Sequence, residues 1–262
     1  LAGSWALVYN ALISGGHSVI VPKFSASAFL DQCRTYGATH TVLLGGLVDF
    51  LLAQPERPDD PDNPLRVVYT MPVRHDFEAF ERRFGVRTYT AYGSTEANQP
   101  LFGRVGELVP GGCGKPVPDI DVRLVDPEDR EVPVGSVGEL VVRPKEPWMI
   151  MMGYDGMPAE TNAAWRNLWF HTGDLMRRDE DDQHYFVGRV RDSIRHHGEN
   201  IAALEVESQI ITHPAVAEVA VIGVPNDVGE QDVMAIVVPE QGVRVDPVDL
   251  VEYLEARVPR YM

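Results

Sequence analysis

The stretch WFHTGDLMRRDEDDQHYFVGRVRDSIRHHGENIAALEVE, from Trp169 to Glu207, carries three separated signals in a fixed order. In HTGD, His171–Asp174, a carboxylate directly follows a flexible glycine. A basic, turn-rich segment begins further on, at Gly188 and Arg189. HHGEN, His196–Asn200, is a glycine loop that opens a predicted helix. By themselves these segments also fit two strands and a helix joined by ordinary loops.

A second signal, YGSTE at Tyr92–Glu96, directly follows a strand predicted over Val86–Thr90. In an open α/β sheet, ligands bind beyond the carboxyl ends of the strands. A hydroxyl beside a carboxylate suits a nucleotide–magnesium complex, because the hydroxyl can donate to phosphate while the carboxylate holds the hard cation. Taken alone, the pentapeptide is equally typical of a capped helix start.

With YGSTE, HTGD, the segment from Gly188 and the GEN loop together, the chain resembles the adenylate-forming superfamily over nearly its whole length. That superfamily includes acyl-CoA synthetases, luciferases and peptide-synthetase adenylation domains. The resemblance implies an ATP-dependent acyl-CoA synthetase, which joins a carboxylic acid to CoA through an acyl-adenylate. ATP, Mg²⁺ and CoA are the implied cofactors and co-substrates. GRVRDSIRHHGENI and WMIMMGY are most similar to crotonobetaine/carnitine-CoA ligases or medium-to-long-chain acyl-CoA ligases.

The same resemblance implies a nucleotide site and a catalytic pair. The implied ATP- and AMP-binding residues are Tyr92, Gly93, Ser94, Thr95, Asp174, Phe186 and Arg189. Tyr92 would help to form the adenine site, and the catalytic pair would be Thr95 on phosphate and Glu96 on Mg²⁺. Asp174 would accept from the ribose hydroxyls, and the Arg189 guanidinium would contact ribose and phosphate. Plainer readings stay open: a turn aspartate, a surface arginine and, for Phe186, a core side chain.

Two further elements follow from the resemblance. Arg191 would be the hinge for rotation of a C-terminal lid, although the superfamily often has Asp or Lys there. Gly198, Glu199 and Asn200 would help to shape the pantetheine tunnel for CoA, or would form only a tight turn. A second departure is Thr70–Val73, which stands where relatives commonly have a Gly/Ala-rich adenine loop.

The expected fold class is α/β, with a partial N-terminal α/β domain, a small antiparallel β-barrel-like subdomain and a small α+β C-terminal lid. The expected divisions are residues 1–100, 101–188, a hinge at 189–192, and 193–262. The strands expected from apolar runs are Val19–Pro22, Thr39–Leu44, Val67–Thr70, Val86–Thr90, Asp121–Val125, Gly138–Arg143, Val216–Val224 and Val233–Val238. The expected helices are one capped by Ser25 and ended by Gly37, Leu47–Ala53, one anchored by Phe77, Phe80 and Phe84, Ala203–Thr212, and Pro247–Val258 with Val251, Leu254 and Val258 on one side. Pro55–Pro64 is an expected surface loop.

Composition narrows the class of protein. The chain has 262 residues, 44% of them hydrophobic, with 39 acidic against 23 basic residues and a net charge of −16. This balance argues against binding to nucleic acid or anionic membrane. Apolar runs are too short to span a bilayer. Cys33 and Cys113 form no CxxC pair, which argues against a zinc site or a disulfide framework and favours the cytoplasm.

The superfamily's phosphate loop is expected before Leu1 and its adenylating lysine after Met262, so the 262 residues alone are expected to be inactive in adenylation. Two rival functions stay open. One is an adenylation domain that loads a carrier protein, which Ser94 and the GENI loop argue against because such domains usually have YGPTE and a different glycine loop. The other is a noncatalytic nucleotide-binding remnant. Neither the acid nor the oligomeric state follows from the sequence.

Overall fold

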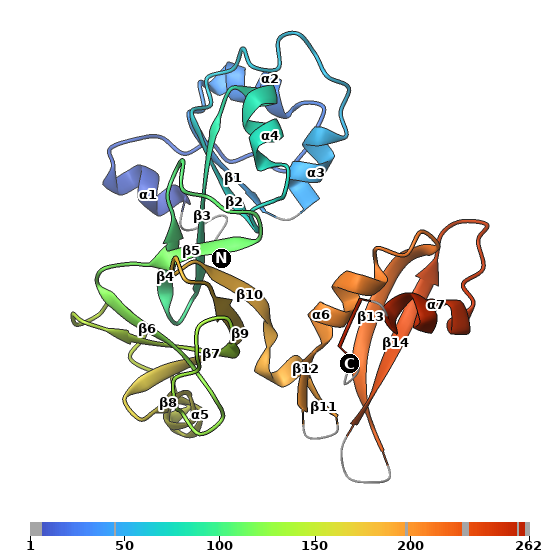
Figure 1. Cartoon of the computed structure of the whole chain (residues 1–262). Helices are drawn as coiled ribbons and strands as arrows, with labels where there is room; N and C mark the ends of the chain where they lie inside the picture. Colours follow the sequence, from blue (N-terminus) through green and yellow to red (C-terminus); the bar gives the residue numbers. More distant parts are fainter. Residues whose placement is uncertain (1–6, 45, 197–198, 227–230, 256, 260–262) are drawn as a thin grey trace.

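A computed structural model describes residues 7–44, 46–196, 199–226, 231–255 and 257–259. These residues form one ten-stranded sheet and two two-stranded sheets (Figure 1). The helices are α1 (Leu7–Ile13), α2 (Phe29–Tyr36), α3 (Gly46–Leu52), α4 (Phe77–Phe84), α5 (Pro158–Ala164), the 3₁₀ helix η2 (Val190–Asp192), α6 (Ala203–Ile210) and α7 (Pro247–Glu255). The strands are β1 (His40–Leu44), β2 (Val67–Met71), β3 (Arg87–Ser94), β4 (Asn98–Gly103), β5 (Gly112–Pro116), β6 (Ile120–Val125), β7 (Val137–Pro144), β8 (Trp165–Arg166), β9 (Trp169–Arg178), β10 (His184–Arg189), β11 (Ser193–His196), β12 (Glu199–Ala202), β13 (Val216–Pro225) and β14 (Gln231–Pro239).

The N-terminal part is a parallel α/β unit, as expected. Strands β1, β2 and β3 pair in parallel, and α2, α3 and α4 pack on them around Leu43, Val68, Phe80 and Phe84. The phenylalanines of α4 recur at helical spacing, so their rings gather on one side of the helix. Gly85 ends α4 in the left-handed region with φ 65°, where glycine avoids the steric cost of a side chain.

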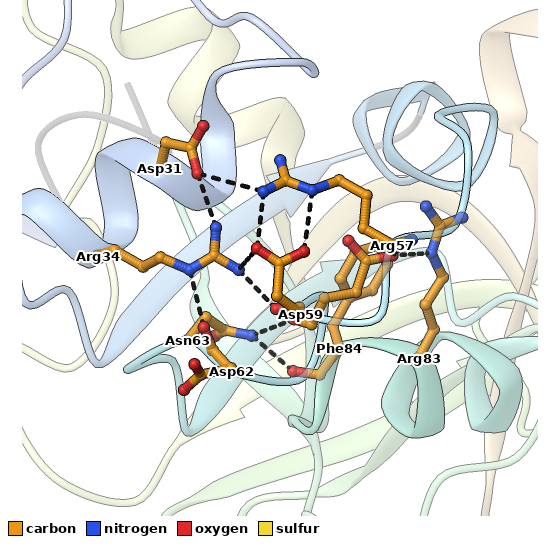
Figure 2. Close-up of polar contacts among 9 residues, drawn as sticks. Asp31, Arg34, Arg57, Asp59, Asp62, Asn63, Arg83 and Phe84 are labelled. Atoms are coloured by element: carbon orange, nitrogen blue, oxygen red, sulfur yellow. Dashed lines mark hydrogen bonds and ion pairs between the residues drawn. The ribbon is translucent and has the colours of Figure 1, made fainter.

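The loop over Pro55–Pro64 is irregular, as expected, but it is firmly attached to the helices beside it (Figure 2). Arg83 Nε lies 2.8 Å from Asp60 Oδ2, and Arg83 also donates to the carbonyl of Leu52 at 2.9 Å. Arg34 donates to the carbonyls of Asp59 at 2.6 Å and Asp62 at 2.7 Å. Asp60 is only 3% exposed. A buried ion pair between this surface loop and α4 therefore fixes the path of the loop.

The expected antiparallel subdomain is present but does not close into a barrel. Its strands continue the same sheet in the order β1-β2-β3-β4-β5-β10-β9-β7-β6, and β8 pairs with β9. This path is open, with β1 at one end and β6 at the other. Leu101, Leu140, Phe170 and Met176 lie in the core cluster of this part, which also contains Tyr92. The sheet thus joins the parallel and antiparallel parts continuously.

The C-terminal part is a small α+β unit that stands beside the sheet in Figure 1. It follows η2, which occupies the predicted linker, and contains the hairpins β11–β12 and β13–β14 with α6 and α7. Its core includes Ile194, Val206 and Ile210. The longest helix within the described ranges, α7, has nine residues. None of these helices is long enough to cross a membrane.

Three local predictions are wrong. Val19–Pro22 is irregular, because a strand needs a partner and this segment pairs with no strand among the described residues. Ser25 does not cap α2, which begins after Ala28 without a side-chain cap. Helix α7 ends at Glu255, before Val258, and of the predicted face Leu254 packs on the core beside the buried Leu250, whereas Val251 is 57% exposed. The apolar positions of α7 allowed either face, and packing selected the one that carries Leu250.

Candidate nucleotide site

YGSTE begins in β3 and turns directly into β4. Tyr92 is buried, Thr95 is exposed in the turn, and Glu96 is half-buried. Ser94 Oγ accepts from the Ala97 N–H at 3.1 Å, which closes the turn. Ser94 also pairs with Asn98 across the hairpin. The segment is therefore a β-hairpin turn and not a capped helix start.

HTGD lies inside β9, at a pronounced bulge. On β9, Thr172, Gly173 and Asp174 stand opposite Leu140 of β7 alone, because Val141 pairs with His171 and Glu139 pairs with Leu175. Gly173 has φ 73°, a value that glycine adopts without steric cost. Bulges redirect side chains and recur beside active sites. Here the bulge turns Asp174 toward the end of β3.

Three of the predicted nucleotide residues come together at this bulge. The Tyr92 hydroxyl donates to Asp174 Oδ2, and Arg189 Nε lies 3.3 Å from Asp174 Oδ1. Arg189 is the register partner of Asp174 on β10. Burial, and then the Asp174 carboxylate, raise the pKa of Tyr92 well above its usual range. The phenol therefore stays protonated and remains a donor.

Glu96 lies beside Tyr154, the last residue of WMIMMGY, to which the sequence analysis assigned no role. Tyr154 donates to Glu96 Oε1 at 3.4 Å, and the Met151 N–H donates to the Glu96 carbonyl at 2.8 Å. Burial, and then the Glu96 carboxylate, raise the pKa of Tyr154. Within the described part of the chain, no three His, Cys, Asp or Glu side chains form a group able to hold a metal ion. A cation at Glu96 would therefore depend on ligands from a bound substrate.

The remaining predicted site residues have no described contact with Asp174. Phe186 is 38% exposed, so it is not a core side chain. With Arg189 and Arg191 it lines a cavity of about 610 Å³ between β10 and the C-terminal unit. Arg191 is exposed and lies 3.5 Å from Asp192. Gly198 is outside the described residues, and Glu199 and Asn200 are described only as backbone of β12, paired with His196 and Arg195.

Sequence reasoning missed the side chains behind the bulge. Glu139 and His171 contact each other there, and neither was assigned a role. One signal was present for Glu139, since it is a single acid within the apolar run of β7, VGELVV. An acid at such a position calls for a buried partner.

Comparison with known proteins places these features in one family. The family sequence model described as "AMP-binding enzyme" matches residues 2–155, and that of the "AMP-binding enzyme C-terminal domain" matches residues 205–262. The chain is 38% identical to the medium/long-chain-fatty-acid–CoA ligase FadD17 of Mycobacterium marinum, over 92% of this chain and 47% of that protein. It is 35% identical to the crotonobetaine/carnitine–CoA ligase of Proteus mirabilis, over 87% of this chain and 45% of that protein.

The fold agrees with these matches. The crystal structure of ATP-bound MatB from Rhodopseudomonas palustris superposes with a TM-score of 0.83 at 28% identity, over 99% of this chain and 52% of that one. The chain spans about half the length of the relatives that it matches.

Proposed function

The chain belongs to the AMP-binding enzyme family, and on that premise we propose that the natural protein containing it is an ATP-dependent, AMP-forming acyl-CoA synthetase. The observation that carries this proposal is the meeting of Tyr92, Asp174 and Arg189 at the β9 bulge. The names of the two relatives, both CoA ligases, support the same activity.

Asp174 is the proposed ribose-binding residue. Its side chain keeps 13% exposure, so it can be reached from solvent. A carboxylate offers about four acceptor sites, and Tyr92 and Arg189 each engage one oxygen. Acceptor capacity therefore remains for the two ribose hydroxyls. Arg189 is half-exposed and would hold the adjoining phosphate with its free guanidinium edge.

Thr95 and Glu96 are the proposed phosphate and magnesium residues for Mg·ATP as substrate. Thr95 is exposed in the turn, and the Glu96 carboxylate contacts Tyr154 through one oxygen. Mg²⁺ in nucleotide sites commonly takes one or two carboxylates together with substrate phosphates. A single protein carboxylate therefore fits this use. The Ser94 hydroxyl closes the turn that carries Thr95 and Glu96. Gly93, the residue before Ser94, is exposed.

The proposed reaction has two steps. A carboxylate oxygen of the acid attacks the α-phosphorus of ATP, and the bond to pyrophosphate breaks. The thiol sulfur of CoA then attacks the carbonyl carbon of the acyl-adenylate, loses its proton, and AMP leaves. In the first step, positioning and charge stabilisation supply most of the rate enhancement.

The hinge and the CoA tunnel are also proposals. Arg191 lies in η2, directly between the sheet and the C-terminal unit, where a change of backbone angles would move that unit as a body. Glu199 and Asn200 begin β12 of the moving unit, and Gly198, which lies outside the described residues, directly precedes them in the sequence. We place the protein in the cytoplasm, because Cys33 and Cys113 are free and buried in separate clusters.

The test is a carboxylate panel assayed on the natural protein with Mg·ATP, with and without CoA. The panel contains medium- and long-chain fatty acids, crotonobetaine and carnitine. CoA-dependent AMP release together with an acyl-CoA product is the expected result. AMP release that requires a phosphopantetheine carrier protein instead of CoA would indicate carrier loading. ATP binding without pyrophosphate release from any acid would indicate a noncatalytic nucleotide-binding protein.

A further inference from the structure

The bulge that presents Asp174 is held from the neighbouring strand. Thr172 Oγ1 donates to the Leu140 carbonyl at 2.8 Å and accepts from the Asp174 N–H at 3.1 Å. Glu139 Oε1 accepts from the Gly173 N–H at 3.1 Å. These backbone groups are displaced from the ladder by the bulge, and side chains replace the lost pairing. The backbone on both sides of Gly173 is thus fixed by β7.

The second oxygen of Glu139 is held by a cluster of its own. His171 Nδ1 lies 2.8 Å from Glu139 Oε2, and the His171 side chain is 4% exposed. Arg166 Nη2 approaches Glu139 Oε2 at 3.4 Å. On the far side of the imidazole, His171 Nε2 lies 3.7 Å from Asp129 Oδ1. Glu139 therefore has one oxygen on the bulge and the other beside His171 Nδ1 and the Arg166 guanidinium, whose Nη2 also lies 2.8 Å from His171 Nδ1.

We infer that Glu139 is a positioning residue for Asp174, and that His171 and Arg166 orient Glu139 for this task. The inference rests on the proposed nucleotide role of Asp174. Glu139 touches neither Tyr92 nor Arg189 in any described contact, so its effect on the nucleotide would pass through the Gly173 peptide. Groups that bind a ligand must be held within about 0.5 Å by their supporting shell, and an unsupported bulge has more conformations available to it.

The test is a double-mutant cycle on the natural protein, with the dissociation constant for Mg·ATP measured by calorimetry. Glu139→Ala is expected to weaken binding roughly tenfold, a typical coupling between residues in one network. In the Asp174→Ala background the same substitution should change binding less than about twofold. A purely structural role would instead weaken binding by the same factor in both backgrounds.

Two variants serve as matched controls. Glu139→Gln removes the charge but keeps an amide oxygen that can accept from the Gly173 N–H, so binding should return to within about threefold of wild type. Glu131→Ala removes a half-exposed carboxylate that pairs with Arg178 at 3.0 Å on the same part of the sheet, away from the bulge. Its binding constant should equal that of wild type.

The outcomes separate this inference from the proposed function. Weakened binding by Asp174→Ala with wild-type binding by Glu139→Ala would overturn the positioning role alone. Wild-type binding by Asp174→Ala would remove the nucleotide assignment, and the positioning role with it. If Glu139→Ala does not fold, Thr172→Val takes its place, because it removes the Thr172 hydroxyl that bonds the Leu140 carbonyl and the Asp174 N–H. The decrease in Mg·ATP affinity that it causes must likewise disappear in the Asp174→Ala background.

Discussion

The phenol of Tyr92 donates a hydrogen bond to the carboxylate of Asp174, although the two residues are 82 positions apart in the sequence. The bond joins the YGSTE turn to the HTGD bulge across the core of the sheet. Tyr92 is only 6% exposed, so its hydroxyl has little access to water as an alternative acceptor. Two of the sequence signals are therefore physically connected.

Tyr92→Phe is expected to lower the free energy of unfolding by about 1.5–3 kcal/mol, because a buried carboxylate loses a donor. Tyr69→Phe is the matched control. Tyr69 donates to the neutral carbonyl of Ala91 at 2.9 Å, so its loss should be about 0.5–1.5 kcal/mol. Urea unfolding of both variants measures the difference. Equal decreases in unfolding free energy would mean that the hydrogen bond to the Asp174 carboxylate stabilises the fold no more than the bond to a neutral carbonyl.

Arg83→Ala should destabilise the protein by roughly 3 kcal/mol or more, because it leaves the buried Asp60 carboxylate without its cation. The Arg83 and Asp60 side chains are 11% and 4% exposed. The neighbouring Arg82 is exposed, and Arg82→Ala should stay within about 0.5 kcal/mol of wild type. Urea unfolding measures the unfolding free energy of both variants. A change within about 0.5 kcal/mol for Arg83→Ala as well would show that the ion pair adds no stability.

Leu168→Gly should stabilise the protein by about 0.5–1 kcal/mol, because relief of roughly 1–2 kcal/mol of left-handed backbone strain exceeds the entropy that glycine adds to the unfolded chain. Asn167 and Leu168 form the two-residue turn between β8 and β9, with φ 50° and 65°, a conformation in which glycine is preferred at the second position. Leu168 is 80% exposed, so little apolar burial is lost. Thermal unfolding should show a higher Tm for Leu168→Gly and no gain for Leu168→Ala, which keeps a side chain in the left-handed region. A Tm at or below wild type for the glycine variant would contradict this.

Acid stability should depend on His184. This side chain is 1% exposed, and burial lowers its pKa below the usual value of about 6.5. As the pH falls below about 6.5, the unfolded chain binds a proton that the folded chain does not, so stability decreases. His184→Asn can still donate to the Asp182 carbonyl, which His184 Nδ1 contacts at 3.0 Å. Urea unfolding should therefore show a smaller decrease in unfolding free energy from pH 7 to pH 5.5 in the variant than in wild type. An equal decrease in both proteins would exclude His184 as a cause of the acid destabilisation.

Local signals in the sequence were sufficient for most elements of the fold. The repeated phenylalanines of α4 and the glycine after it gave both the helix and its end. Val19–Pro22 failed because a strand depends on a neighbour that local pattern does not reveal. The continuity of β4 and β5 with β10 likewise depends on pairing between distant segments. Such pairing is decided by tertiary packing.

In the candidate site, too, residues within local motifs could be predicted, whereas residues that depend on long-range pairing could not. YGSTE, HTGD and the segment that begins at Gly188 identified Tyr92, Asp174 and Arg189 through the resemblance, and the structure brings these three together. Glu139 was missed because its position in an apolar run indicated a buried partner but not which one, and that partner is set by the bulge on β9. Tyr154 was missed for a related reason, since its contact with Glu96 joins two loops far apart in sequence.

The most direct measurement of the central claim is AMP binding to the natural protein by calorimetry, comparing wild type with Asp174→Ala. Asp181→Ala, at the exposed tip of the β9–β10 hairpin, is the control for loss of a negative charge. Loss of charge-assisted hydrogen bonds to the ribose should weaken AMP binding by roughly tenfold or more, while Asp181→Ala binds as wild type. Equal dissociation constants for all three proteins, each folded, would contradict a nucleotide site at Asp174.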